Sequence, residues 1–184
     1  MIRAWIMGLL LAMAPGLSSA QDASVLDQPG AVLLMRHALA PGTGDPANFA
    51  LGDCSTQRNL DEAGRAQARR IGAALRQAGM VPTHVFTSEW CRCRETAALL
   101  DLGEVTPLPA LNSHFAGRGD REAQARAVRE VLAELPADAR PLLVTHQVNI
   151  TALSGVFPRS GEIVVTLPNE NGQLVEAGRF LVDP

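Results

Sequence analysis

Three apolar stretches of the chain end in residues that could bind and attack a phosphoryl group. Arg36 and His37 follow the first stretch, Ser88 and Arg92 follow the second, and His146 follows the third. Arginine holds oxyanions through paired, permanently charged hydrogen bonds, and a neutral imidazole is an accepted covalent nucleophile. A lone histidine at the end of a strand is usually structural, but the recurrence of such residues at three strand ends predicts an anion site with a potential nucleophile.

Each of the three stretches has the composition of a strand that is buried on both faces of a sheet. Continuous apolar runs of this kind are typical of parallel sheets, and they cover residues 31–35, 84–87 and 141–145. Apolar or small residues at steps of three or four predict helices over 61–78, 92–100, from Asp120 onward, and near 148–153. A closing pair of strands is expected over 163–167 and 175–182.

This alternation of strands and helices predicts an α/β three-layer sandwich, with a largely parallel central sheet and helices on both faces. In open α/β sheets, ligands bind just beyond the carboxyl ends of the strands. The polar residues that follow the three apolar stretches are therefore expected to lie close together.

The first twenty residues have the pattern of a secretory signal peptide. A single charge at Arg3 precedes an apolar run over 4–14, and small residues precede an expected cleavage site after Ala20. The run is too short to span a bilayer and is broken by Pro15 and Gly16. We therefore expect a signal peptide over 1–20, a single domain over 21–184, and a periplasmic or secreted product without stable membrane insertion after cleavage. A retained signal peptide is the alternative.

The composition narrows the possible functions. The chain has 184 residues, of which 47% are hydrophobic and 19% are charged, as expected for one globular domain. Its formal net charge of −3 gives no indication of nucleic-acid binding. All 16 basic residues are arginine, so Schiff-base catalysis and a phosphate-binding P-loop lysine are excluded.

Three cysteines, Cys54, Cys91 and Cys93, lie in the expected mature part of the chain. In an exported protein, disulfides persist, and an odd number of cysteines leaves one thiol unpaired. Cys91 and Cys93 are too close in sequence to pair well with each other, so Cys54 is expected to pair with one of them. The alternative is three buried free thiols. No metal site is expected, because one Cys-x-Cys pair with scattered histidines does not supply two ligand clusters.

Four segments resemble motifs of the histidine phosphatase superfamily, which includes phosphoglycerate mutases and small phosphohistidine phosphatases. Residues 34–38 resemble its Arg-His-Gly signature, and residues 58–68 and 86–97 are similar to two further motifs of the family. Residues 144–146 match the strand that carries its second histidine. The four segments occur in the family's order within residues 31–167, so the resemblance implies a phosphoglycerate mutase-like fold.

The resemblance also implies a role for each matching residue. His37 would be the nucleophile that forms a phosphohistidine, while Arg36, Arg92 and His146 hold the phosphoryl oxygens and Arg58 assists. His146 is expected to act as an imidazolium, and no cofactor is required because arginines neutralise the oxygens. Further substrate-binding contacts are expected from Ser88, Gln147, Asn112 and Glu162.

The chain departs from the family pattern at two places. Ala38 replaces the usual glycine after the nucleophilic histidine. The proton donor is missing as well: Gln147 stands where acid phosphatases have aspartate, and no glutamate occurs at 111–113, where mutases have one. The remaining candidates for the donor are His114, Glu89, Asp53 and Glu162. Alternatively, no donor is needed because the leaving group is good, such as a phosphorylated nitrogen, a phenol, an anhydride or an acyl phosphate.

The favoured function is therefore an exported phosphatase that acts on a phosphomonoester or phosphoramidate. Its partner would be a small phosphorylated substrate or a phosphoprotein. One alternative is a module that binds a phosphorylated ligand with little turnover. A mutase-type phosphotransferase is a further alternative, against which export and the missing glutamate both argue. The natural substrate and the oligomeric state are not indicated by the sequence.

Overall fold

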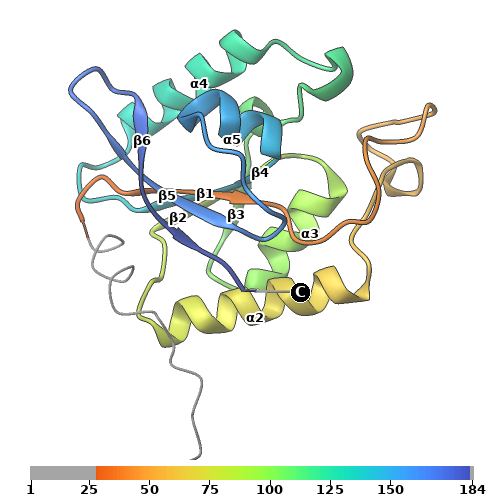
Figure 1. Cartoon of the computed structure of the whole chain (residues 1–184), viewed down its shortest axis with the longest axis horizontal. Coiled ribbons are helices and arrows are strands. Elements are labelled where there is room, and N and C mark those ends of the chain that lie inside the picture. Colours follow the sequence, from red (N-terminus) through yellow and green to blue (C-terminus); the bar gives the residue numbers. More distant parts are fainter. Residues whose placement is uncertain (1–27, 183–184) are drawn as a thin grey trace, which may run out of the picture.

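The computed structural model describes residues 28–182 of the chain, and the predicted signal peptide lies outside this range. The described residues form one six-stranded sheet in the order β3-β2-β4-β1-β5-β6 (Figure 1). The strands are β1 (Val32–Arg36), β2 (His84–Thr87), β3 (Val105–Pro107), β4 (Pro141–Thr145), β5 (Ile163–Pro168) and β6 (Leu174–Phe180).

The sheet is mixed. Strands β3, β2, β4 and β1 run parallel to one another, while β5 and β6 are antiparallel to their neighbours. The predicted α/β fold is confirmed, and the expected closing strand pair forms the antiparallel edge. Strand β6 ends at Phe180, two residues before the predicted end at Val182.

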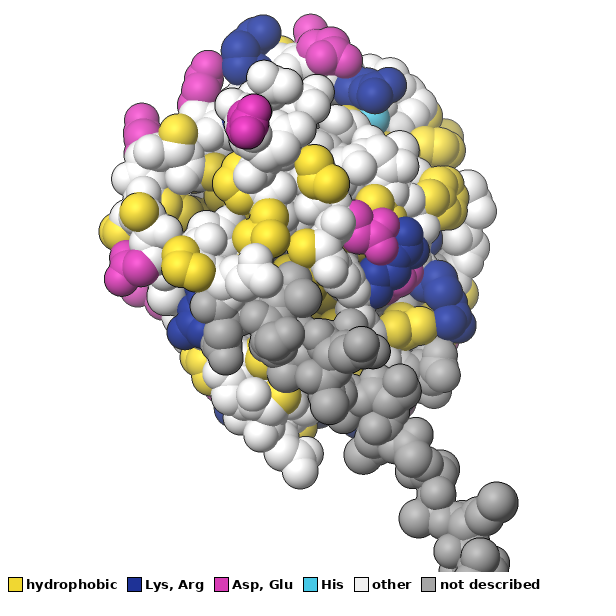
Figure 2. Space-filling view, turned by 60° about the vertical axis from the view of Figure 1, so that its left-hand side comes forward, with side chains coloured by type: hydrophobic (Ala, Val, Ile, Leu, Met, Phe, Trp, Pro, Cys, Tyr) yellow, Lys and Arg dark blue, Asp and Glu magenta, His cyan; other side chains and the backbone are white. Residues whose placement is uncertain are grey.

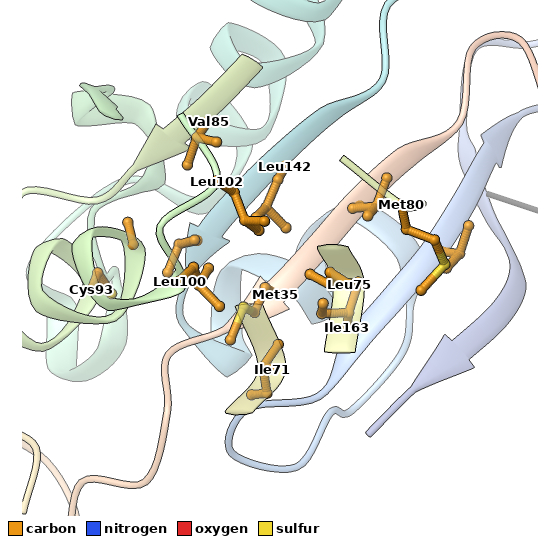
Figure 3. Packing of buried hydrophobic residues seen from close by; sticks show 14 of the residues in the cluster. Met35, Ile71, Leu75, Met80, Val85, Cys93, Leu100, Leu102, Leu142 and Ile163 are labelled. Atoms are coloured by element: carbon orange, nitrogen blue, oxygen red, sulfur yellow. The ribbon is translucent and has the colours of Figure 1, made fainter. Parts of the chain in front are cut away.

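Two hydrophobic cores lie on opposite faces of the sheet, because side chains of a strand alternate between its faces. Leu33 and Met35 of β1 join the core under α2 (Glu62–Gln77) and α3 (Cys91–Leu100). Figure 3 shows Met35 beside Ile71 of α2 in this core. Val32 and Leu34 of β1 join the second core, under α4 (Arg121–Glu134) and α5 (Gln147–Ser154). Fully burying each such side chain contributes about 1.5–3 kcal/mol.

Helices α2 and α4 begin after the aspartates that the sequence marked as helix starts. The side chain of Asp61 accepts a hydrogen bond from the backbone N–H of Gly64, and Asp120 caps α4 in the same way. A side chain at Gly64 would lie 1.9 Å from the carbonyl oxygen of Leu39. Only glycine therefore allows α2 to approach the segment that follows His37, so this contact positions the candidate nucleophile.

The sequence patterns did not predict β3 or three short 3₁₀ helices, η1 (Cys54–Thr56), η2 (Pro109–Leu111) and η3 (Phe115–Gly117). β3 has three residues at the edge of the sheet, and only Val105 among them is partly buried. A strand of this length has no recognisable apolar run, and one turn of 3₁₀ helix has no periodicity.

Among residues 28–182, no helix is both long and apolar enough to span a bilayer. Figure 2 shows one face of the molecule, on which arginine and acidic side chains are interspersed with hydrophobic ones. The described part of this face presents no broad area of positive charge.

Candidate active site

A pocket of about 110 Å³ opens at the carboxyl ends of β1 and β4. The structure brings together in its lining six residues that the sequence indicated: Arg36, His37, Arg58, Arg92, His146 and Gln147. These side chains come from β1, from the loop before α2, from α3 and from the start of α5. The pocket thus combines three guanidinium groups with two imidazoles.

His37 is buried and held in one tautomer. Its Nδ1 lies 2.8 Å from the carbonyl oxygen of Ala38, and since a carbonyl can only accept, Nδ1 carries the proton. The lone pair is therefore on Nε2. Burial lowers the pKa of His37 well below its ordinary value, and the charge of Arg92 lowers it further. A neutral imidazole with a free Nε2 lone pair is the form that can attack phosphorus.

His146 is also neutral, contrary to the expected imidazolium. Its Nδ1 lies 3.3 Å from an N–H of Arg92, which can only donate, so Nδ1 accepts. Nε2 then carries the proton and donates to Oγ of Ser88 at 3.0 Å. Burial, followed by the charge of Arg92, holds the pKa of His146 well below the usual range. The buried, arginine-rich site disfavours the imidazolium in the free protein, and an imidazolium in the phosphate-bound state stays a prediction.

Arg36 and Arg58 are fixed by backbone carbonyls. Arg36 donates to the carbonyl of Pro158 at 3.1 Å, and its Nε is buried without a hydrogen-bond partner. Arg58 donates to the carbonyls of Gly44 and Ala40. Burial lowers the pKa of Arg58 to about 10, with a further contribution from Arg92. The charge of Arg92 lowers the pKa of both Arg36 and Arg58, which marks a site with a strong positive potential.

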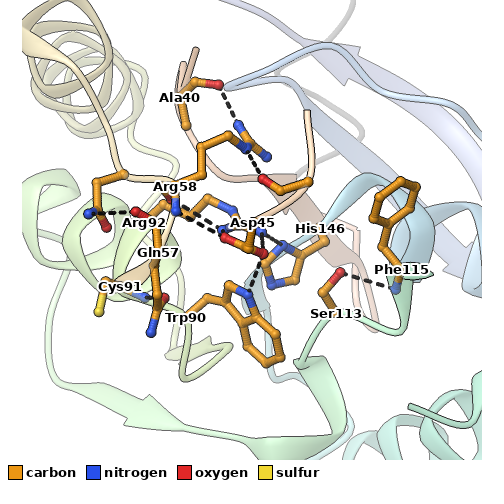
Figure 4. A network of polar contacts seen from close by, with 12 residues as sticks. Ala40, Asp45, Gln57, Arg58, Trp90, Cys91, Arg92, Ser113, Phe115 and His146 are labelled. Carbon is orange, nitrogen blue, oxygen red and sulfur yellow. Dashed lines mark hydrogen bonds and ion pairs between the residues drawn. The ribbon is translucent and has the colours of Figure 1, made fainter. Parts of the chain in front are cut away.

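Asp45 is the main residue of the site that the sequence analysis missed. Its carboxylate, which is 5% exposed, receives two hydrogen bonds from Arg92, at 2.7 and 3.3 Å. It also accepts from the backbone N–H of Arg58 and from the indole N–H of Trp90 (Figure 4). Burial alone would raise the pKa of Asp45, but these hydrogen bonds lower it overall. Its sequence context, Gly-Asp-Pro in a loop, indicates only a turn.

Three residues that were predicted to bind substrate do not line the pocket. Ser88 accepts from His146 and donates to Oδ1 of Asn112, so both support the second histidine from behind. Glu162 is buried, accepts from the backbone N–H of Arg159 and pairs with Arg179 at 3.3 Å. Gln147 does line the pocket, and its amide donates to Thr151.

None of the four candidate proton donors lines the pocket. Glu89 accepts from Nδ2 of Asn112, and Asp53 is exposed and caps η1. His114 lines a separate hollow together with residues of α4 and α5, and Glu162 is paired with Arg179. Among the described residues of the pocket lining, Asp45 alone carries a carboxylate.

A disulfide between Cys54 and Cys91 ties the loop of Arg58 to the start of α3, with the two Cα atoms 5.7 Å apart. The predicted bridge is therefore present, and Cys91 rather than Cys93 is the partner. Gln57 adds a second tie, because its Oε1 accepts from the backbone N–H of Cys91. Cys93 is a buried free thiol whose pKa is raised by burial to about 12.

Comparison with known proteins agrees with this geometry. A sequence model of the histidine phosphatase superfamily (branch 1) matches residues 32–120, which include Arg36, His37, Arg58 and Arg92. No curated protein matches the chain. The fold and the residues at its strand ends define a phosphoglycerate mutase-like α/β protein. The segment that carries these arginines and His37 thus matches the histidine phosphatase superfamily.

Several solved structures share the fold at low sequence identity. The protein histidine phosphatase SixA, complexed with tungstate, has a TM-score of 0.58 and 20% identity, over 82% of this chain and 96% of that one. A putative phosphohistidine phosphatase SixA from Agrobacterium tumefaciens also has a TM-score of 0.58, with 17% identity over 84% and 100%. A phosphoserine phosphatase from Entamoeba histolytica, complexed with 3-phosphoglyceric acid, has a TM-score of 0.60 and 11% identity, over 83% and 97%.

Proposed function

We propose that the protein is a phosphatase that hydrolyses a phosphomonoester or phosphoramidate through a phosphohistidine on His37. The observation that carries this proposal is the state of His37, which is buried and neutral and has its lone pair on Nε2. It lies in a pocket lined by three arginines. The similarity to SixA, a protein histidine phosphatase, supports the same reaction class.

In the first step, Nε2 of His37 attacks phosphorus and the bond to the leaving group breaks. The arginines act by position and charge, because phosphoryl transfer spreads negative charge over the equatorial oxygens. Nε of Arg36 is buried without a partner, so a phosphoryl oxygen would satisfy it. In the second step, water attacks the phosphohistidine, releases phosphate and restores the neutral imidazole.

His146 takes part as a neutral group in the free protein. Ser88 and Asn112 hold it from behind, and its Nδ1 faces Arg92. A bound phosphoryl dianion would add negative charge beside Nδ1 and favour its protonation. His146 would then donate a hydrogen bond to a phosphoryl oxygen only when substrate is present.

The setting that we propose for this activity is outside the cytoplasm, on the basis of the signal-like pattern over 1–20. The substrates would be small phosphorylated molecules or phosphoproteins. No metal ion is needed in this scheme, since the arginines carry the charge that a metal would otherwise supply.

The test is turnover of p-nitrophenyl phosphate by residues 21–184. The wild type should hydrolyse it, and His37→Ala should lose at least about a thousandfold in kcat, as expected for a missing nucleophile. His84→Ala is the matched control, because His84 lies at the opposite end of β2, outside the pocket lining. Phosphate binding without turnover by the wild type would instead indicate a binding module.

A further inference from the structure

The proposed phosphatase reaction has no assigned proton donor, because none of the candidates that the sequence offered lines the pocket. We propose that Asp45 is this donor, held on Arg92 in the free protein and released when a phosphoryl group takes its place. The inference rests on the proposed function and adds a catalytic residue to it.

The first observation is that Arg92 has no terminal N–H left for a ligand. One terminal nitrogen donates to Asp45 at 2.7 Å and to the carbonyl of Arg58 at 3.2 Å. The other donates to Asp45 and to Nδ1 of His146, each at 3.3 Å. A guanidinium carries two protons on each terminal nitrogen, so all four are committed. A phosphoryl group can reach the two protons that Asp45 accepts only where its carboxylate gives way.

The second observation is that the carboxylate of Asp45 accepts hydrogen bonds from a set of donors that suits a phosphoryl group. It accepts a fork of hydrogen bonds from Arg92 and two further N–H groups, from Arg58 and Trp90. Figure 4 shows Asp45 at the centre of these donors, with His146 beside it. A ligand that displaces the carboxylate can accept hydrogen bonds from the same donors. The displaced carboxylate remains on the pocket lining, next to the phosphoryl oxygens.

The loop that carries Asp45 is built to allow this exchange. Gly42 and Gly44 have φ values of +90° and +72°, a region that glycine enters without strain and other residues rarely adopt. Both glycines line the pocket with Asp45. Asp45 directly follows the second of these glycines, so its carboxylate can change direction without distorting β1 or α2.

The exchange also reverses the protonation of Asp45. On Arg92 the carboxylate is held ionised. Away from the guanidinium and beside a phosphoryl dianion, the charged form is disfavoured, so the carboxyl takes up a proton from solvent. As the bond from Nε2 of His37 to phosphorus forms, the bond to the leaving oxygen breaks and that oxygen takes its electron pair. The carboxyl proton of Asp45 passes to it, which leaves an alcohol, a phosphohistidine and a carboxylate.

The second half of the reaction returns the proton. The carboxylate of Asp45 accepts a proton from water as the water oxygen attacks phosphorus, and the P–N bond electrons return to Nε2 of His37. Orthophosphate leaves, and Asp45 loses its proton and pairs with Arg92 again. Every proton and electron pair is accounted for without an additional reactant.

The experiment compares two aryl phosphates whose leaving groups differ in basicity. p-Nitrophenolate leaves well without a proton, whereas phenolate needs one. Asp45→Asn should lower kcat for phenyl phosphate about a hundredfold more than kcat for p-nitrophenyl phosphate, the usual contribution of general acid catalysis. Asp53→Asn is the control, because it removes the same charge from the same loop at an exposed site outside the pocket.

Three results would overturn the inference while leaving the proposed function intact. An equal loss on both substrates, with a raised KM, would show that Asp45 only positions Arg92. An equal gain on both, with a lowered KM, would show that it only competes with the ligand. Asp45→Glu, which keeps a carboxyl group, should retain more activity on phenyl phosphate than Asp45→Asn; failure to do so contradicts the inference even where Asp45→Asn folds poorly. Absence of turnover of p-nitrophenyl phosphate by the wild type would refute the proposed function itself.

Discussion

Removing the disulfide between Cys54 and Cys91 should weaken both the fold and the anion pocket. The bridge joins residues 37 positions apart. On a chain-entropy estimate, closing a loop of that length stabilises the folded state by about 4 kcal/mol. For a domain of this size, about 1 kcal/mol corresponds to roughly 2–4 °C, so the paired variant Cys54→Ser/Cys91→Ser should melt about 10 °C lower.

The effect on activity follows from where the bridge lies. Cys91 is next to Arg92, and Cys54 leads into the turn before Arg58. Without the bridge, the segments that carry the two guanidinium groups are held together by hydrogen bonds such as that from the backbone N–H of Cys91 to Gln57. We expect KM for p-nitrophenyl phosphate to rise several-fold, with a smaller change in kcat.

The assay is thermal unfolding and steady-state kinetics with and without dithiothreitol. The reductant should lower the melting temperature and raise KM of the wild type, and should change neither in the paired variant, which serves as the matched control. An unchanged melting temperature after complete reduction would refute the reasoning. A melting temperature that falls as expected, with an unchanged KM, would refute the expected effect on the pocket.

Further predictions concern the charges of the site. Arg92→Lys should lower kcat/KM at least about a hundredfold, because a point charge cannot reproduce the fork of hydrogen bonds; near-wild-type kcat/KM would show that Arg92 does not grip the phosphoryl group. Since the pKa of His37 and that of His146 are both lowered, the attacking imidazole should stay neutral as the pH falls through about 6.5, and loss of kcat/KM at that pH would contradict this. Below about pH 6.5, histidines of the unfolded chain take up protons, whereas the two buried ones do not. The free energy of unfolding, measured in urea, should therefore fall as the pH drops below about 6.5. A free energy of unfolding that does not change with pH would argue against two buried neutral histidines. Ser88→Ala removes the acceptor of the His146 N–H, which should lower kcat about tenfold with little change in KM; equal kcat in steady-state assays would exclude a positioning role.

The parts of the fold that the sequence predicted are those with strong patterns. Buried parallel strands have continuous apolar runs, so 31–35 and 141–145 were recognisable, and Asp61 and Asp120 marked helix starts that the structure reproduces. β3 was missed because an edge strand of three residues carries too little burial to leave a pattern.

The sequence predicted the site residues that directly follow strands. It did not predict the residue that a loop brings back to the site. Arg36, His37 and His146 are placed by the sheet itself, so their meeting follows from topology. Asp45 reaches Arg92 across 47 residues of sequence, through a loop whose path depends on glycine conformations and on the disulfide. The neutral state of His146 likewise depends on three-dimensional neighbours, which no local pattern encodes.

The central claim is a covalent phosphohistidine on His37, and trapping that intermediate tests it most directly. Residues 21–184 would be mixed with labelled p-nitrophenyl phosphate, quenched in alkali within the first turnover, and mapped by mass spectrometry. The account predicts phosphate that is stable to alkali and labile to acid, on His37 alone, and absent from His37→Ala but present in His84→Ala. Turnover with the label on another residue, or with no phosphoenzyme at any quench time, would contradict it.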